Sequence, residues 1–119
     1  MGPLKDITIL EFAGIGPGPF CGMLLADLGA EVIKVNRPES KGTSGELITD
    51  RSKKLITLNL KRKDSLKQLY KLIQQVDGIF EGYRPGVMEK LQLGPDKLLQ
   101  INPGLVYGRM TGWGQYGTK

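Results

Sequence analysis

The 119-residue chain is 39% hydrophobic and 24% charged, a composition typical of one globular domain over residues 1–119. No apolar run approaches the roughly 18 residues of a transmembrane helix, and the first residues lack the apolar stretch of a signal peptide, so we expect a cytoplasmic protein without a membrane segment. One cysteine, Cys21, and no histidine exclude a disulfide, a Ser/His triad and a metal site of the usual ligands, while the net charge of +5 comes without any nucleic-acid-binding pattern and leaves a small anionic ligand open.

The first predicted elements form a βαβ unit. Residues 7–13 are a short apolar and β-branched run that predicts a strand, and a turn rich in Gly and Pro follows at 14–19. Pro19 can take the first helical position, apolar residues follow at helical spacing, and Gly29 is a natural end for this helix. Residues 31–35 are the next strand, and the right-handed connection makes the two strands parallel.

The same alternation continues along the chain. The polar residues 37–50 predict a surface loop, and residues 55–60 alternate like a strand with one buried face. An apolar stripe predicts a helix that is capped by Asp64 or Ser65 and extends to Val76. The remaining elements are a strand at 78–81, a short helix at 85–90, a second one between 93–96 and 102–104, a strand at 105–110 and a loop at 111–115. This order predicts an α/β fold, a Rossmann-like parallel sheet with flanking helices.

The turn at 14–19 lies where Rossmann folds bind a pyrophosphate at a helix N-terminus. Its spacing is G-x-G-x-G, and the prolines at 17 and 19 remove backbone donors from the loop. Asn36 and Arg37 stand where an NAD enzyme has an acidic residue, which argues against NAD. An arginine there suits a ribose phosphate, as in NADP or coenzyme A. The alternative is a rigid turn that binds no phosphate.

Basic residues gather around the predicted strand ends. Arg37, Lys61 and Arg84 each follow a strand, and ligands of parallel sheets bind beyond the carboxyl ends of the strands. Three cations at one sheet edge would suit a polyanionic cofactor. The alternative is a solvated charged rim, which applies equally to the other basic residues around the third strand, namely Arg51, Lys53, Lys54, Arg62 and Lys63.

Four blocks occur in order along the chain. They are LEFAGIGPGPF at 10–20, ADLGAEVIKV at 26–35 with Arg37 shortly after it, EGYRPGVM at 81–88 and GRMTGWGQ at 108–115. Together these blocks resemble the α-methylacyl-CoA racemases of the family III CoA-transferase superfamily, and the resemblance covers essentially the whole chain. It implies the Rossmann-like large domain of that fold, incomplete here, with two interlocked chains and acyl-CoA as the ligand.

The resemblance also implies which positions contact coenzyme A. The glycine-rich loop would shape the wall of the active site and not bind pyrophosphate. Coenzyme A would be part of the substrate, so no prosthetic group is expected. The implied contact residues are Ile15, Gly16, Pro17, Arg37, Leu58, Asn59, Leu60, Lys61, Gly82, Tyr83, Arg84 and Lys90.

The chemistry of the family needs residues that this chain lacks. Racemisation beside a thioester requires one group to remove a proton and another to return it. In these racemases a histidine shortly after the Gly-Trp-Gly-Gln block and a later aspartate take these roles, and the transferases use a later aspartate. The chain ends at Lys119, with Thr118 where the family has proline. We therefore expect no catalytic residue here, and a structural role for Glu11, Cys21, Asp27 and Glu81.

Two hypotheses of different classes follow. The first is an amino-terminal fragment of a racemase-like enzyme that retains part of the CoA site and binds acyl-CoA weakly and in a salt-sensitive way. The second is a non-catalytic association module, or a subunit of a split family III CoA-transferase, because an unfinished sheet exposes an edge and one face. Its partner would be a second copy or a complementary carboxyl-terminal chain. An NADP-binding Rossmann domain is a third, weaker alternative.

Overall fold

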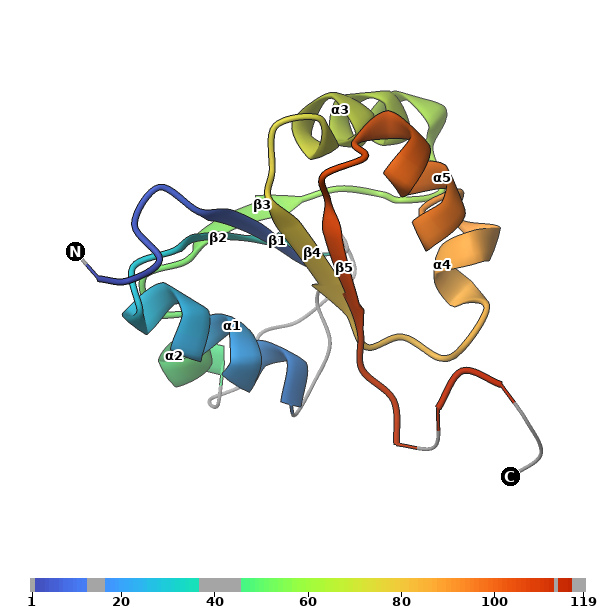
Figure 1. Cartoon of the computed structure of the whole chain (residues 1–119). Helices are drawn as coiled ribbons and strands as arrows, with labels where there is room; N and C mark the ends of the chain where they lie inside the picture. Colours follow the sequence, from blue (N-terminus) through green and yellow to red (C-terminus); the bar gives the residue numbers. More distant parts are fainter. Residues whose placement is uncertain (1, 13–16, 37–45, 113, 117–119) are drawn as a thin grey trace.

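The computed structural model describes residues 2–12, 17–36, 46–112 and 114–116. Strands alternate with helices along these residues (Figure 1). The elements are β1 (Thr8–Phe12), α1 (Pro17–Asp27), β2 (Glu31–Asn36), α2 (Glu46–Thr49), β3 (Lys54–Thr57), α3 (Lys63–Ile73), β4 (Gly78–Glu81), α4 (Val87–Lys90), α5 (Pro95–Ile101) and β5 (Val106–Arg109).

The strands form one sheet in the order β3-β2-β1-β4-β5, and every neighbouring pair is parallel. The chain adds β2 and β3 on one side of β1 and then crosses to add β4 and β5 on the other. This confirms the predicted Rossmann-like parallel sheet with flanking helices. The direction of strand addition reverses between β1 and β4, and the crevice beyond the carboxyl ends of such strands is where open α/β sheets bind ligands.

Helices cover both faces of the sheet (Figure 1). On one face α3, α4 and α5 bury the main core, in which the β1 side chains of Leu10 and Phe12 pack with Leu69 of α3, Met88 of α4 and Leu98 of α5. Successive strand residues point to opposite faces. Glu11, between Leu10 and Phe12, therefore points to the other face, where α1 packs against β1 and β2.

Helix α1 starts earlier than the sequence predicts. It begins at Pro17, two residues before Pro19, because the first turn of a helix has no intrahelical partners for its N–H groups and tolerates proline at both positions. The predicted end is confirmed, since Gly29 has a φ of 106° and the N–H of Ala30 donates to the carbonyl of Leu25 across it.

Two further predictions need correction. Helix α3 begins at Lys63, with Arg62 at the N-cap position and no side-chain cap, so neither Asp64 nor Ser65 caps it. The sequence predicts a loop over residues 37–50, but the structure has the short helix α2 at the end of this range. Residues 37–45 of the predicted loop lie outside the described residues. Among the residues that the structure describes, no helix has the length and apolar character needed to cross a bilayer.

Candidate functional site

A basic hollow lies between the start of α3 and the end of α4, and we call it the α3–α4 hollow. It encloses about 320 Å³. Leu60, which lines the hollow, is only 6% exposed and packs in the core. The N–H of Lys61 donates to Oδ1 of Asn59 and stabilises the turn before α3. The residues that line it are Leu60, Lys61, Arg62, Lys63, Leu66, Lys90, Leu91 and Gln92.

The α3–α4 hollow favours an anion. Lys61, Arg62, Lys63 and Lys90 bring four positive charges to its wall, and the N-terminal end of α3 adds the partial positive charge of the helix dipole. Asp64 lies 3.6 Å from Arg62, but both side chains are well exposed and such a pair contributes little.

A second hollow, the β4–β5 hollow, lies beyond the carboxyl ends of those two strands and encloses about 470 Å³. The N–H of Met110 donates to the carbonyl of Glu81, which joins the segments that leave β4 and β5. The wall of the β4–β5 hollow includes three glycines, two tyrosines and one exposed cation, Arg84. The lining residues are Gly82, Tyr83, Arg84, Pro85, Met110, Thr111, Gly112, Gly114, Gln115 and Tyr116.

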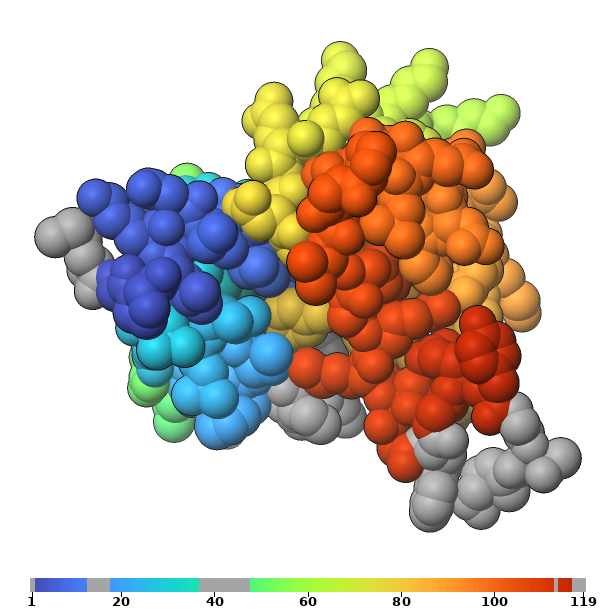
Figure 2. Space-filling view, viewed as in Figure 1, coloured from blue at the N-terminus to red at the C-terminus, as the bar shows by residue number. Residues whose placement is uncertain are grey.

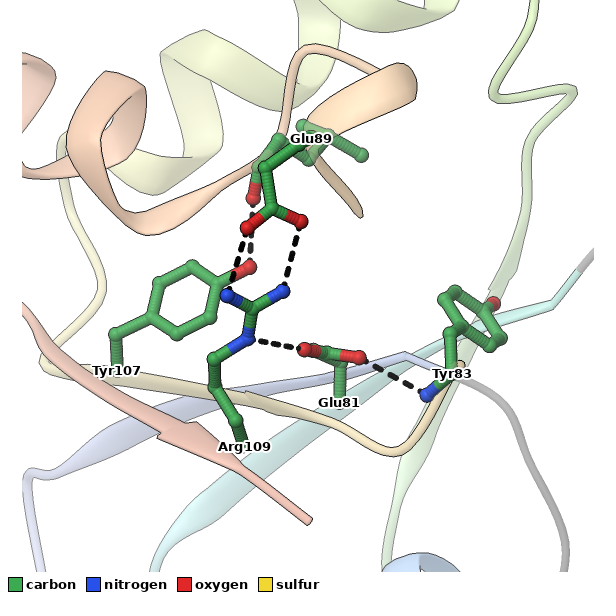
Figure 3. Close-up of polar contacts among 6 residues, drawn as sticks. Glu81, Tyr83, Glu89, Tyr107 and Arg109 are labelled. Atoms are coloured by element: carbon green, nitrogen blue, oxygen red, sulfur yellow. Dashed lines mark hydrogen bonds and ion pairs between the residues drawn. The ribbon is translucent and has the colours of Figure 1, made fainter. Parts of the chain in front are cut away.

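Three charged residues, each next in sequence to a residue that lines one of the hollows, form an ionic cluster that we call the Arg109 clasp (Figure 3). Nε of Arg109 donates to Oε2 of Glu81 at 2.8 Å, and its two terminal nitrogens donate to the carboxylate of Glu89 at 2.8 and 2.9 Å. The other oxygen of Glu81 accepts the backbone N–H of Tyr83 at 2.9 Å. Glu81 is only 1% exposed, so its charge depends on these partners.

The contacts of the clasp shift the pKa values of Glu89 and Arg109 in opposite directions. The two hydrogen bonds from Arg109 lower the pKa of Glu89, and the contacts with Glu89 and Glu81 raise the pKa of Arg109. Burial, with help from Glu81, raises the pKa of Tyr107, whose hydroxyl donates to the carbonyl of Leu93 at 2.7 Å. Glu89 and Arg109 are therefore both charged at neutral pH.

The clasp gives a pH-dependent prediction. Because the pKa of Glu89 is lower in the folded state, the ion pair stabilises the fold above the ordinary pKa of 4.5, and this stabilisation disappears as the pH falls through the lower value. Urea unfolding of the wild type and of Glu89→Gln should therefore show a stability difference that is greatest at pH 7 and shrinks below pH 4.5. A difference that stays constant with pH would mean that Glu89 acts through packing alone.

The structure brings some of the sequence-predicted positions together. Leu60, Lys61 and Lys90 line the α3–α4 hollow. Gly82, Tyr83 and Arg84 line the β4–β5 hollow. The two sets therefore line two different hollows instead of one shared cation cluster.

The other predicted positions are scattered or undescribed. Leu58 and Asn59 lie in the turn after β3, where the N–H of Leu58 donates to the carbonyl of Asn36. Pro17 begins α1. Ile15, Gly16 and Arg37 lie outside the described residues.

A second ionic cluster lies buried on the α1 face. Nζ of Lys53 is 2.8 Å from Oε1 of Glu11, 3.7 Å from Oδ1 of Asp50 and 3.1 Å from the carbonyl of Pro19, and Nζ of Lys34 is 2.8 Å from the same Asp50 oxygen. The side chains of Glu11 and Lys53 are fully buried. Lys53 is thus not part of a solvated rim, and it joins β1, the first turn of α1 and the segment before β3.

Burial on the α1 face also shifts the pKa values of Glu11 and Cys21. Burial raises the pKa of Glu11 despite its contact with Lys53. Burial, reinforced by the Glu11 carboxylate, raises the pKa of the Cys21 thiol, so Cys21 stays protonated and unreactive at neutral pH. Both findings agree with the expected structural roles. Within the described part of the chain, no three His, Cys, Asp or Glu side chains form a group that could hold a metal ion.

Sequence reasoning missed the clasp and half of the basic hollow. Arg62 and Lys63 were indistinguishable from surface charges, because the hollow exists only when α4 lies beside α3. Arg109 had a readable signal: it stands near the end of the strand that follows Glu81, and the two residues are register partners on β4 and β5.

Comparison with known proteins identifies the family of the chain. Residues 4–119 match the family model of CoA-transferase family III. The chain is 49% identical over 114 residues to the α-methylacyl-CoA racemase of Mus musculus, a match that covers 96% of this chain and 29% of the mouse protein. It is 38% identical over 128 residues to the succinyl-CoA–L-malate CoA-transferase beta subunit of Chloroflexus aurantiacus, covering 97% of this chain and 32% of that protein.

A solved structure has a similar fold over nearly the whole chain. The fold is similar to the crystal structure of Rv3272 from M. tuberculosis, with a TM-score of 0.89 and 37% sequence identity, over 99% of this chain and 36% of that one. The chain spans less than a third of the two sequence relatives described above. Because the family match extends over nearly all of its residues, the chain belongs to CoA-transferase family III.

Proposed function

We propose that this chain forms part of the binding site for the coenzyme A moiety of an acyl-CoA. One observation supports this most: the basic residues Lys61 and Lys90, from separate elements, line one hollow with Arg62 and Lys63. Phosphate groups are the natural partners of such a cluster. Coenzyme A belongs to the substrate, so the proposal includes no prosthetic group.

The two hollows suit the two halves of coenzyme A. The phosphorylated adenosine half carries most of the negative charge, and we assign it to the α3–α4 hollow. The pantetheine half is a narrow chain with amide groups, and we assign it to the β4–β5 hollow, whose lining includes three glycines, two tyrosines and a single charged residue. Residues 82–90 connect the two. Ile15, Gly16, Pro17 and Arg37 stay proposed contacts from the family resemblance.

We further propose that the chain corresponds to the amino-terminal part of a racemase-like enzyme that epimerises 2-methylacyl-CoA thioesters by exchange of the α-proton. The sequence has no histidine to remove or return that proton. The chain by itself is therefore proposed to act in binding or assembly and not in turnover. The cytoplasmic location and the single-domain organisation expected from the sequence are part of the same proposal.

The binding proposal predicts the effect of removing one cation. Lys61→Ala and Lys90→Ala should each weaken coenzyme A binding roughly tenfold, the value of one charge-assisted contact of about 1.4 kcal/mol. The binding of both variants should also depend less on salt, since each loses a screened charge. Calorimetric titration with coenzyme A at two salt concentrations measures both effects.

A matched control lies on the same helix. Lys71 is an exposed lysine in the last turn of α3, about 12 Å along the helix from Lys63 at 1.5 Å per residue. Lys71→Ala removes the same charge and should leave binding unchanged. Equal losses in all three variants would indicate a nonspecific charge effect and contradict the site. A change in NADPH fluorescence on mixing would instead support the dinucleotide alternative.

A second candidate function is association with another chain, and an exposed apolar surface favours it. Phe20 and Leu24 lie four residues apart on α1 and Leu28 follows directly after its end; they are 52%, 45% and 45% exposed. Val106 of β5 is 71% exposed. Figure 2 shows α1, in light blue, at the surface of the molecule. Apolar patches of this kind often mark protein interfaces.

Association predicts a concentration-dependent mass. Light scattering after size exclusion should show dimers or larger species at high concentration, and Leu24→Ser should shift the protein towards monomer by removing apolar surface from the centre of the stripe. Leu99→Ser is the matched control, because Leu99 is a comparably exposed leucine on α5. A clean monomer at every concentration would contradict self-association and leave a complementary chain as the partner.

A further inference from the structure

One short segment contributes to both hollows. Residues 82–85 line the β4–β5 hollow, and residues 90–92 line the α3–α4 hollow. The position of one hollow relative to the other therefore depends on how residues 82–92 are held.

This segment has little stability of its own. Helix α4 has four residues, too few for an isolated helix in water. Its N-cap residue, Gly86, has a φ of 89° and provides no side-chain cap. The segment is held by tertiary contacts instead, with Met88 and Leu93 fully buried in the core and the hydroxyl of Tyr70 donating to the carbonyl of Gln92.

We propose that Arg109 is a positioning residue that closes the segment between Glu81 and Glu89 and so fixes the two hollows at the separation that one extended polyanionic ligand requires. Arg109 contacts both ends of the segment at once. On one side Glu81 is bonded to Arg109 and to the N–H of Tyr83, and on the other side Glu89 is adjacent to Lys90. The identity of the ligand as coenzyme A rests on the proposed function.

The planar guanidinium is suited to this role. It donates to two carboxylates in different directions, two bonds to Glu89 and one to Glu81. A lysine at this position keeps the charge but cannot reproduce that geometry, because its ammonium group is a compact point charge. Arg109→Lys therefore preserves the compensation of the buried Glu81 charge while it loosens the segment.

The test compares whole coenzyme A with its halves. NMR titrations of the wild type and Arg109→Lys would use coenzyme A, adenosine 3′,5′-bisphosphate and pantetheine, with dissociation constants corrected for the folded fraction. A linked ligand gains affinity only when both halves can engage together. We expect Arg109→Lys to lose roughly tenfold in affinity for coenzyme A and less than about twofold for either half, on the scale by which misplaced linked groups lose effective concentration.

Two controls separate positioning from stability. Glu89→Gln removes the charge and one of the two acceptor oxygens at the α4 end of the segment and leaves the Arg109–Glu81 pair in place, so it should show the same selective loss. Arg51→Lys alters an exposed arginine that forms two hydrogen bonds with Asp27, and it should change none of the three affinities. Unchanged coenzyme A binding in Arg109→Lys, or equal losses for coenzyme A and both halves, would overturn the proposal.

Amide hydrogen exchange decides the same point without a ligand. Arg109→Lys should exchange faster at Tyr83, whose N–H donates to Glu81, and at Lys90 of α4 and its C-cap residue Leu91, while amides in the middle of α3 keep their wild-type rates. Unchanged exchange at these positions would contradict the proposal that Arg109 holds residues 82–92 in place. Failure of the wild type to bind any of the three compounds would overturn the proposed function and the ligand coupling, while the exchange result would still decide whether Arg109 holds the segment.

Discussion

Replacing Lys53 by methionine is expected to lower the free energy of unfolding by about 3 to 5 kcal/mol, the cost of leaving one member of a buried ion pair uncompensated. The side chain is fully buried, 2.8 Å from the equally buried carboxylate of Glu11. Lys53 also donates a hydrogen bond to the carbonyl of Pro19, and methionine cannot donate in its place. Urea unfolding followed by circular dichroism measures the loss.

The pH and a double variant identify the cause. Without Lys53 the pKa of Glu11 should rise further, so Glu11 takes up a proton more readily and the loss becomes smaller towards low pH. Lys53→Met combined with Glu11→Gln should recover much of the stability, since neither buried group is then charged. Arg51→Met, at an exposed ion pair close by in the sequence, should change stability little. A similarly small effect of Lys53→Met would contradict the buried cluster.

The fold was predictable because its elements are encoded locally. The strand at 78–81 and the end of α1 at Gly29 follow from short apolar runs and a residue that tolerates positive φ. The parallel arrangement follows from the handedness of βαβ connections. Helix α2 was missed because its four residues lie in a stretch rich in Gly, Ser and Thr, and no periodic pattern can emerge in one turn.

The site was predictable only in part, because residues that line the same hollow are far apart in the sequence. The family resemblance selected Lys61 and Lys90, and the structure places both on one hollow. Arg109 stood in a matching block but received no role. A pair of opposite charges near the ends of successive predicted strands could have indicated its contact with Glu81, as the observed register shows.

Buried charge explains the largest error of the sequence analysis. Lys53 comes from a run of basic residues, and its neighbours Arg51 and Lys54 are indeed exposed. Its burial depends on an acid more than forty residues earlier, so no local pattern reports it. The readable half of this cluster was Glu11, an acid inside an apolar strand, opposite Lys34 in the parallel register. An acid in such a position needs a partner.

The two ionic clusters occupy opposite faces of the sheet. The Glu11–Lys53 cluster attaches the start of α1 beneath β1, and the Arg109 clasp attaches α4 above β4 and β5. Each joins a segment that follows a carboxyl end of the sheet to a neighbouring strand or loop. The two clusters therefore attach a helix to each face of the sheet, next to β1 and β4, the strands between which the order of strand addition reverses.

The same buried cluster makes Gly22 hard to replace. In an average helix interior, Gly→Ala stabilises by about 1 kcal/mol. At Gly22, however, an added Cβ would lie 1.9 Å from Oε1 of Glu11 and 3.0 Å from Nζ of Lys53. Helix α1 would have to move away from β1 or the buried pair would have to separate. We expect Gly22→Ala to destabilise by about 1 to 3 kcal/mol, as for other overpacked cores, when measured by urea unfolding.

Gly18 provides a control on the same helix. A Cβ added there would meet no atom within 4 Å, so Gly18→Ala should be neutral or stabilise by up to about 1 kcal/mol. The two variants make the same chemical change in α1 and should differ in sign. If both stabilise, the close approach of α1 to Glu11 is wrong. If Gly22→Ala becomes tolerable when Glu11 is shortened to aspartate, the carboxylate itself limits how closely the helix can pack against β1.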